Sequence, residues 1–323
     1  MIEPREPREQ PEKTTLVSAP GKAFLIGEYA VLEGASAVVT AVDIRAQACS
    51  APAPGHASEV VRAAHAQIRR YLQEHALPHP GPPPSVDTGS FRLGTRKIGL
   101  GSSAAVAATV VGFLLEEAGI EIASAEGRAA AYELARSGHK EAQGGGSGAD
   151  VATSICGGTL RFEDGEATPV ALPEWLRIGF VDAGAPASTA SFVQMVRSAA
   201  LASPDAYSVA ITDLQGASRQ FLTVLADAKA GKRSEAVLFA ALKEAVARHN
   251  RGLRTLQRIS EAPIMTPTIE RILEVAADMG LAAKPSGAGG GDLVVVFARS
   301  QAALDLLADR LRRDHNIDLL AGL

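Results

Sequence analysis

The chain has 323 residues, of which 46% are hydrophobic and 21% charged, values typical of a globular protein with one large or two ordinary domains. Its net charge of -4 excludes a general attraction to nucleic acid or to an anionic membrane, so an anion-binding site must be local. The two cysteines, Cys49 and Cys156, fit neither a metal-binding spacing nor a disulfide framework. We therefore expect a soluble protein of a reducing compartment, the cytoplasm, without nucleic-acid or membrane partners.

No segment has the pattern of a targeting or membrane-spanning sequence. Residues 1–14 are polar and rich in Pro, Glu and Arg, and they lack the apolar core of a signal peptide, so we expect a disordered tail. The longest apolar run, residues 104–115, is too short to cross a bilayer.

The first third of the chain predicts mainly strands. Apolar patterns indicate β segments at residues 15–18, 23–26, 37–44 and 46–49. Pro20 and Gly21 are expected to break the first two apart. Apolar residues at helical spacing then predict a helix over 60–74, followed by a stiff, proline-rich connector at 78–85.

A glycine-rich segment in the middle of the N-terminal half opens an apolar helix that covers residues 106–115. It reads Gly99-Leu100-Gly101-Ser102-Ser103-Ala104 and directly follows Lys97 and Ile98. Backbone N–H groups that converge at the start of a helix form an anion site, which indicates an enzyme that handles phosphate. Hydroxyls that follow the glycines, as in Ser102 and Ser103, suit phosphate oxygens or a phosphate-bound Mg²⁺.

Three other interpretations of this segment are weaker. It is not a P-loop of the GxxxxGK[ST] kind, because no Lys-Ser/Thr pair follows the glycines. It fits the loose dinucleotide pattern GxGxxA, but the preceding residues 91–97 are charged and do not resemble a buried strand. A tight turn that only allows close helix packing is the remaining alternative.

A second glycine-rich loop, residues 144–150, opens an apolar helix over 151–156 and ends in Asp150. Asp150 is either the N-cap of that helix or a group that orients the attacking oxygen of a substrate. Lys22 follows Pro20 and Gly21 beside an apolar stretch. It is either a surface lysine or a charge that keeps a carboxylate ionised and neutralises a transferring phosphoryl group.

Three further ionisable residues allow more than one interpretation. His139 and Glu141, near the end of a helix predicted over 124–137, are either solvated or part of the site. Glu28 is either a buried partner for a cation or a capping residue. Ser124 is the expected N-cap of the helix that precedes His139.

The second half of the chain is mostly helical. We expect strands at 159–162 and 177–181, helices through 191–260 and 267–279, a loop at Lys284, a strand at 293–297 and a helix at 301–313. This irregular alternation favours an α+β fold over a doubly wound parallel sheet. A domain boundary is expected near residues 183–190.

Three motifs taken together resemble those of the GHMP kinases, which phosphorylate small metabolites. The first motif combines Ala19-Pro20-Gly21-Lys22 with Gly27-Glu28-Tyr29-Ala30-Val31, the second is the Gly99–Ala105 segment, and the third is Ser286-Gly287-Ala288-Gly289-Gly290-Gly291-Asp292. The resemblance implies a two-domain α+β fold. Residues 15–186 would form an ATP-binding domain similar to the second domain of ribosomal protein S5, and residues 187–323 a ferredoxin-like domain.

Within the family, the details resemble the phosphomevalonate kinase branch, notably the Glu28-Tyr29 pair, Lys97, Asn250-Arg251 and the final Gly-Asp of the third motif. This implies transfer of the γ-phosphoryl group from ATP, with Mg²⁺, to 5-phosphomevalonate in isoprenoid biosynthesis, by a monomer or homodimer. A mevalonate kinase and a non-catalytic regulator with the same fold are the alternatives. Mevalonate kinases carry a magnesium-binding Glu at the place where the resemblance puts His139 of this chain.

The resemblance also assigns roles to residues. It makes Lys22 and Asp150 catalytic, and it gives the ATP phosphates to Lys97, Gly99, Leu100, Gly101, Ser102, Ser103 and Ala104, with Ser103 also on the metal. It gives the acceptor to Ser147, Gly148, Ser188, Thr189, Ser286, Gly287, Ala288 and Gly289.

Overall fold

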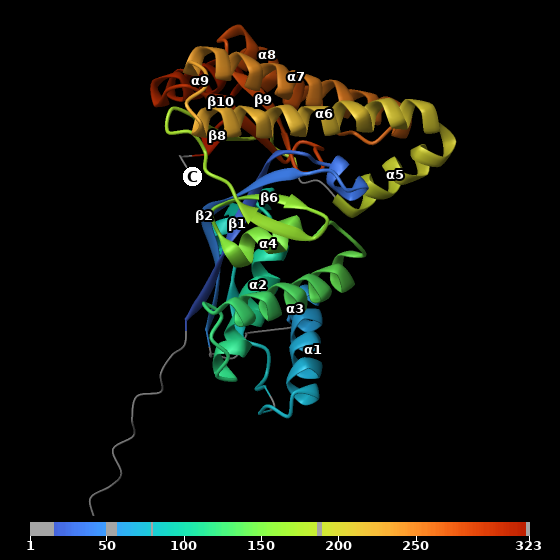
Figure 1. Ribbon diagram of the computed structural model, residues 1–323, viewed down its shortest axis with the longest axis vertical. Helices are drawn as coiled ribbons and strands as arrows, with labels where there is room; N and C mark the ends of the chain where they lie inside the picture. The colour runs from blue at the N-terminus through green and yellow to red at the C-terminus, as the bar shows by residue number, and fades with distance from the viewer. Residues whose placement is uncertain (1–15, 50–56, 79, 186–188, 321–323) are drawn as a thin grey trace, which may run out of the picture.

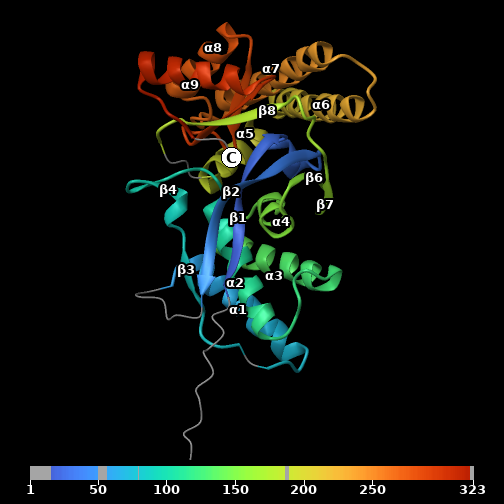
Figure 2. The same ribbon diagram turned by 90° about the vertical axis from the view of Figure 1, so that its left-hand side faces the viewer.

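The computed structural model describes residues 16–49, 57–78, 80–185 and 189–320, and it has two lobes, each built on an antiparallel sheet (Figure 1). The predicted tail at 1–14, the predicted loop at 51–55 and the predicted site residue Ser188 lie outside the described residues. Figure 2 shows the lobes one above the other, with the long helices of the C-terminal half across the top.

The N-terminal lobe contains a sheet with the strand order β1-β2-β6-β7, in which β3 also pairs with β2. Its strands are β1 (Val17–Ile26), β2 (Ala37–Cys49), β3 (Ser85–Asp87), β6 (Thr159–Glu163) and β7 (Glu166–Pro169). Its helices are α1 (Glu59–Glu74), α2 (Ser102–Glu117), α3 (Ala125–Gln143) and α4 (Ala149–Cys156). Helices α2 and α4 pack against β1 and β2, and α1 and α3 pack against α2.

The strand β1 is continuous, so the prediction that Pro20 and Gly21 separate two strands is wrong. The register against β2 shifts between Pro20 and Gly21, which is the signature of a β-bulge. A bulge tolerates a proline within a strand, because the ladder is interrupted there. At Gly21 an added Cβ would lie 2.5 Å from the backbone oxygen of Leu100, so this position lets the second glycine motif approach the strand.

The C-terminal lobe contains a second antiparallel sheet, with the order β11-β8-β10-β9. Its strands are β8 (Arg177–Asp182), β9 (Ala282–Ser286), β10 (Leu293–Ala298) and β11 (Leu319–Leu320). Its helices are α5 (Thr189–Ala202), α6 (Pro204–Lys229), α7 (Glu235–Ser260), α8 (Pro267–Asp278) and α9 (Gln301–His315). The chain therefore enters the second sheet at β8, before the boundary expected at residue 186.

The predicted loop at Lys284 is wrong, because Lys284 and Ser286 lie within β9, whose five residues are all buried. The loop is confined to residues 287–292, here called the third glycine turn. Strands β9 and β10 pair antiparallel, with Leu293 opposite Ser286, so the third glycine turn connects the two strands at one edge of the lobe.

The apolar sequence of α2 is explained by its position. Every residue from Ala104 to Leu115 is buried, so the helix has no solvated face and shows little amphipathic pattern. One apolar cluster includes residues of both lobes, among them Leu25 of β1, Phe221 of α6 and Phe297 of β10. The lobes therefore share a continuous core rather than meeting through a linker. In the described part of the chain, no helix is both long and apolar enough to cross a membrane.

Helix α3 approaches α1 so closely that only a glycine fits between them. A Cβ on Gly138 would lie 2.7 Å from Cα of Ala64. Replacing a mid-helix glycine by alanine ordinarily stabilises a helix by about 0.5–1 kcal/mol, but the clash here should reverse the sign. We predict that Gly138→Ala lowers the free energy of unfolding by about 1–3 kcal/mol in urea titrations. Ser137→Ala, at an exposed neighbouring position, is the control. If Gly138→Ala and wild type had the same free energy of unfolding, the prediction would be contradicted.

Candidate active site

Two helices of the N-terminal lobe begin beside β1, and each begins after a glycine. The N-caps of α2 and α4 are Gly101, with φ 74°, and Gly148, with φ 90°. Neither glycine has a side chain to cap the helix. The first backbone N–H groups of α2 are therefore available to an anion, whereas in α4 those of Ala149 and Val151 bond to the side chains of Ser147 and Asp150. Helices α2 and α4 contact each other as well as β1, which brings the second motif and the Asp150 loop together.

Lys22 of β1 lies against the start of α2. Its backbone N–H donates a 2.8 Å hydrogen bond to the oxygen of Leu100, and its side chain lies against Gly101, where a Cβ would be 2.8 Å from Cε. Phe24 points to the same face of the strand and shares an apolar cluster with Ala149 of α4. Lys22 is 9% exposed, so the surface-lysine alternative is wrong.

The ammonium group of Lys22 has no ion-pair partner among the residues that the structure describes. Its Nζ lies 5.2 Å from the centre of the Phe24 ring. A largely buried, unpaired cation at the start of α2 creates a strongly positive environment, which suits a phosphate group.

A cluster of three side chains joins α2, α3 and α4. The Nε2 atom of His139 lies 3.0 Å from Oγ of Ser103 and 3.8 Å from Oδ2 of Asp150. His139 is buried, so the interpretation that it is solvated is wrong. Glu141 is exposed and accepts a hydrogen bond from Gln67, which turns it away from this cluster.

Asp150 is not the N-cap of α4, because Gly148 occupies that position. Its Oδ1 instead accepts a 2.9 Å hydrogen bond from the N–H of Val151, and its Oδ2 faces His139. A carboxylate in the first turn of a helix is stabilised by the helix dipole. Asp150 therefore lies at the edge of the site, where its carboxyl group can orient a ligand.

A carboxyl group that the sequence argument did not select, Asp292, lies on the second motif. A Cβ on Gly99 would lie 2.2 Å from Cγ of Asp292, so the carboxyl group packs directly on the glycine. Burial raises the pKa of Asp292 to about 6, with Lys22 and Arg96 opposing the rise and Asp182 adding to it. In the sequence, the feature that could have indicated Asp292 as a site residue is its position directly after three consecutive glycines, residues 289–291.

A second group that was not selected is a buried ion cluster around Glu28. Its Oε1 accepts hydrogen bonds from Nζ of Lys284 and, at 3.2 Å, from the N–H of Gly287. Its Oε2 lies 3.1 Å from Nε2 of His249 on α7. Of the two interpretations of Glu28, a buried partner for a cation is confirmed.

The remaining predicted residues are spread around the site. Lys97 is exposed on the hairpin of β4 (Arg92–Leu93) and β5 (Arg96–Lys97), which an Arg96–Asp182 ion pair ties to β8. Ser147 accepts a hydrogen bond from the N–H of Ala149, and Thr189 is exposed at the start of α5.

The hydroxyl of Ser286 does not face the site as predicted. It is buried, accepts a 2.9 Å hydrogen bond from the N–H of Phe24 and donates one to the oxygen of the same residue. Ser286 thus fastens the C-terminal lobe to β1. The side chain of Leu100 is also buried, so this residue can reach a ligand only through its backbone.

The dinucleotide alternative is excluded by the element that precedes Gly99. The dinucleotide pattern requires a buried parallel strand at that place, whereas the chain has the two-residue strand β5 in an antiparallel hairpin.

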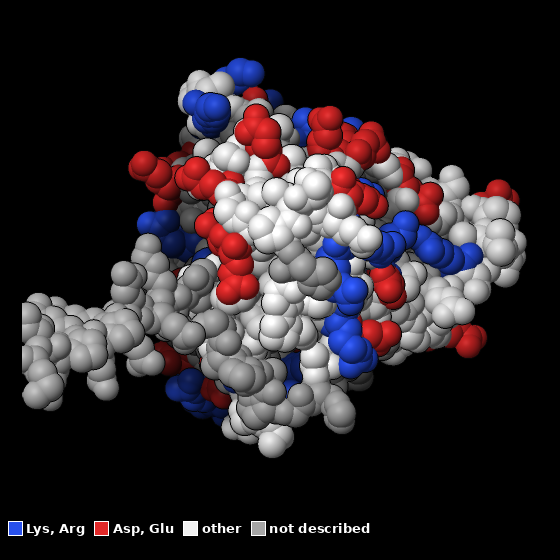
Figure 3. Space-filling view, turned by 90° about the horizontal axis from the view of Figure 1, so that it is seen from below, with Lys and Arg blue, Asp and Glu red and all other residues white. Residues whose placement is uncertain are grey.

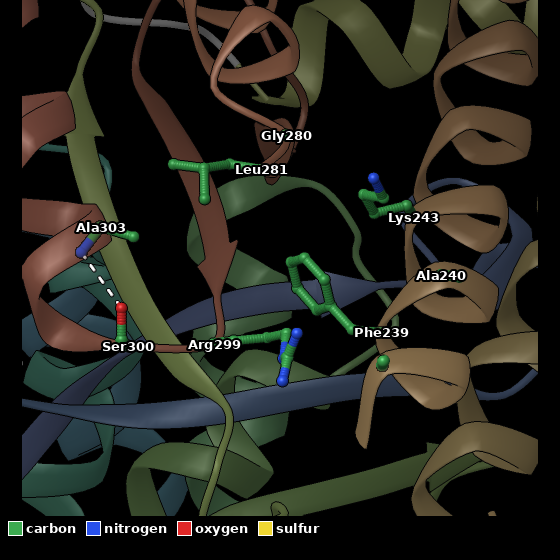
Figure 4. Close-up of a pocket in the computed structure, with 9 residues that line it drawn as sticks. Phe239, Ala240, Lys243, Gly280, Leu281, Arg299, Ser300 and Ala303 are labelled. Carbon is green, nitrogen blue, oxygen red and sulfur yellow. Dashed lines mark hydrogen bonds between the residues drawn. The ribbon is translucent and has the colours of Figure 1, made fainter. Parts of the chain in front are cut away.

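A cavity of about 340 Å³ lies in the C-terminal lobe and is separate from this site (Figure 4). Its lining includes Phe239, Lys243 and Arg299, but none of the residues of the glycine motifs. On the face in Figure 3, described basic and acidic side chains surround a mostly uncharged area and form no continuous basic surface.

The fold and the site define an enzyme class. The model for the GHMP kinases N terminal domain matches residues 88–158, and the model for the GHMP kinases C terminal domain matches residues 236–317. The chain belongs to the GHMP kinase family and is an ATP-dependent kinase that phosphorylates a small molecule.

The chain is similar to a phosphomevalonate kinase and to mevalonate kinases. Phosphomevalonate kinase of Streptomyces sp. (strain CL190) is 26% identical over 366 aligned positions, which cover 93% of this chain and 94% of the relative. Mevalonate kinase of Pyrococcus horikoshii is 29% identical over 223 positions, covering 57% and 62%. A structure of Streptococcus pneumoniae phosphomevalonate kinase superposes with a TM-score of 0.77 at 19% identity, over 96% and 99% of the chains, which supports the shared fold.

The raised pKa of Asp292 gives a prediction for stability. The carboxyl group ionises at pH about 6 in the folded protein and near 3.8 when unfolded, so the charged form destabilises the fold at neutral pH. As the pH falls from 8 to 4, the free energy of unfolding of wild type should rise by up to about 3 kcal/mol relative to that of Asp292→Asn. Urea titrations of both proteins across this range measure the difference. A difference that does not change with pH would contradict the prediction.

Lys22 and Asp150 should affect turnover more than nucleotide binding. We predict that Lys22→Met and Asp150→Asn each lower kcat about 100- to 1000-fold, because each removes a charge that faces the transferred group. The KM for ATP should stay within about threefold, since α2 still supplies its backbone groups. An ADP-release assay with Mg-ATP measures both constants. Glu141→Gln is the control, and near-normal turnover of either variant would remove that residue from the chemistry.

Proposed function

We propose that this kinase transfers the γ-phosphoryl group of ATP to 5-phosphomevalonate and so forms 5-diphosphomevalonate. The observation that carries the proposal is that Lys22 lies against the start of α2, whose Ser103 is connected to the Asp150 carboxylate through His139. This arrangement offers N–H donors and a cation to phosphate oxygens, together with a carboxylate for the acceptor.

The phosphates of ATP would bind at the start of α2. The backbone of residues 99–104 supplies free N–H donors there, and Ser102 and Ser103 add hydroxyl groups. Lys22 faces the same point from β1, and Lys97 lies two residues before Gly99 on the exposed hairpin. Two cations at the phosphates would neutralise the charge that develops on the transferred group.

The residues fit a magnesium ion that arrives with ATP. Among the described residues, no group of three or more His, Cys, Asp or Glu side chains forms a complete metal site. Magnesium commonly needs one or two protein oxygens beside substrate phosphates and water, and Ser103 and Asp150 offer a hydroxyl and a carboxylate around His139. When bound, the ion would neutralise charge on the β- and γ-phosphates.

The acceptor would lie between Asp150 and the third glycine turn. A phosphate monoester has a second pKa near 6 and is mostly ionised at neutral pH, so the acceptor needs orientation more than removal of a proton. Asp150 would orient it, with Ser147, Gly148, Ser188 and Thr189 as contacts. The turn residues Gly287, Ala288 and Gly289 would cover it once both substrates are bound.

Two observations favour a phosphorylated acceptor over mevalonate. The Streptomyces phosphomevalonate kinase aligns along nearly the whole chain, and the Gly-Ala-Gly-Gly-Gly-Asp run of the third motif, residues 287–292, resembles that branch. Mevalonate kinase remains the second candidate, because several relatives of that name match about half of the chain and one, from Thermococcus gammatolerans, matches 88% of it at 25% identity.

The acceptor is tested by ADP release with Mg-ATP, run in parallel on mevalonate and 5-phosphomevalonate. We expect turnover on 5-phosphomevalonate and at most a few per cent of that rate on mevalonate, because an acceptor without the phosphate cannot engage the cations. Turnover on mevalonate alone would transfer the assignment to the second candidate. Absence of turnover on both would require a different small-molecule acceptor.

A further inference from the structure

The carboxylate of Glu28 lies where the first and third motifs meet. It is 3% exposed, and all of its contacts come from the C-terminal lobe. Lys284 of β9 and the N–H of Gly287 share Oε1, while His249 of α7 faces Oε2. Lys284, Gly287 and His249, which are 256, 259 and 221 positions from Glu28 in the sequence, therefore converge on one side chain.

The charge of this cluster is internally balanced. Burial opposes ionisation of Glu28, but Lys284 and then His249 hold its pKa at about 2. Burial lowers the pKa of His249, against the attraction of Glu28, so the imidazole is neutral at pH 7. The Glu28 carboxylate and the Lys284 amino group remain as the ion pair; burial lowers the pKa of Lys284, and the attraction of Glu28 opposes this. No charge of the cluster is left over for a ligand.

The cluster belongs to a set of contacts that hold one end of the third glycine turn. Gly287 donates its N–H to Glu28, and the hydroxyl of Tyr29 donates a 2.7 Å hydrogen bond to the oxygen of Ala288. Just before the turn, the hydroxyl of Ser286 accepts a hydrogen bond from the backbone N–H of Phe24 and donates one to the backbone oxygen of the same residue. Three consecutive residues of the C-terminal lobe are thus attached to the end of β1 and the residues that follow it.

The backbone at the attachment point is strained. Tyr29 has φ 60° and ψ -50°, and the N–H of Ala30 bonds to the oxygen of Glu28 at 2.7 Å, which defines a γ-turn of the uncommon, strained form. Strain of this kind persists where surrounding contacts enforce it, and it is frequent at functional sites. The contacts of Glu28 and Tyr29 with the third glycine turn are the ones that enforce it here.

We propose that Glu28 is a positioning residue, which fixes the third glycine turn relative to Lys22 through Lys284, His249 and the N–H of Gly287. Lys22 and Glu28 lie on the same short stretch of chain, so the contacts that hold Glu28 also set the distance between the catalytic cation and the turn. The inference rests on the proposed function in that the turn is assigned to the acceptor. The position of the turn itself can be measured without any acceptor.

Two double variants separate the hydrogen bond from the charge. Glu28→Met with Lys284→Met removes both charges and the acceptor of the Gly287 N–H, while the buried volume is kept. Glu28→Gln with Lys284→Met removes the same charges but retains an amide oxygen for that N–H. Replacing a buried ion pair by apolar residues of similar size is often neutral for stability, so both proteins should fold.

Hydrogen exchange followed by mass spectrometry gives the first measurement. In the Met/Met variant, amides of residues 287–292 should exchange about tenfold faster than in wild type, whereas amides at the start of α2 should be unchanged. The Gln/Met variant should recover most of the protection. Equal protection of the turn in the Met/Met variant and in wild type would overturn the proposal.

Kinetics with the acceptor give the second measurement. The Met/Met variant should lose about tenfold or more in kcat and keep the KM for ATP within about threefold, and the Gln/Met variant should recover part of the loss. Tyr29→Phe, which removes one neutral hydrogen bond, should cost about fivefold and provides a milder variant if a double variant does not fold. An unchanged kcat in the Met/Met variant would also overturn the proposal.

A matched control is the half-buried Asp213–Arg248 pair between α6 and α7, 3.0 Å apart in the same lobe. Asp213→Asn with Arg248→Met should leave the exchange of the turn and the kcat unchanged. If wild type phosphorylates neither mevalonate nor 5-phosphomevalonate while exchange follows the expected pattern, the proposed acceptor is wrong and the positioning role of Glu28 stands.

Discussion

The buried contact between Glu28 and Lys284 joins the two lobes at the point where the candidate site is assembled. Each ion is costly to bury, and removing one partner of such a pair commonly costs about 3–5 kcal/mol. Because Glu28 lies just after β1 and Lys284 lies in β9, this contact fixes the end of β1 against β9 across the lobes. The first and third glycine motifs are thereby brought to the same place.

The site has a positive electrostatic environment because not all of its cationic side chains are paired with a carboxylate. Lys284 is compensated by Glu28 and Arg96 by Asp182, whereas Lys22 has no described ion-pair partner. The start of α2 adds partial positive charge beside it. Asp292 is the opposing charge on the second motif, and its raised pKa reflects the unfavourable burial of a carboxylate there. The site is thus prepared for an anion before one arrives, which is the condition for electrostatic catalysis.

At the contacts between the motifs, glycines leave space that neighbouring groups occupy. At Gly99 the place of a side chain is taken by the carboxyl group of Asp292, and at Gly101 by the stem of Lys22. At Gly289 an added Cβ would lie 2.4 Å from the backbone oxygen of Ile264. A larger residue at any of these positions would push a charged group or a backbone segment away from the site.

The α+β class, the family and most of the helices could be predicted from the amino-acid sequence. Ser124 caps α3 through the N–H of Gly127, and glycines open α2 and α4, as local pattern predicted. Such features are decided by hydrogen bonds and apolar spacing within a few residues, which can be read along the chain. The three motifs together also identified the chemistry, since their residue types suit phosphate.

Which side chains meet in the site could not be predicted from the sequence and follows from the tertiary packing. This packing placed Pro20 inside a strand, because pairing with β2 through a bulge outweighs the local tendency of proline to break one. It buried Lys284 in β9 against a carboxylate 256 positions away, and it put Asp292 on Gly99 and His139 beside Ser103. These contacts depend on packing between distant segments, and no local pattern along the chain encodes the partner of a buried charge.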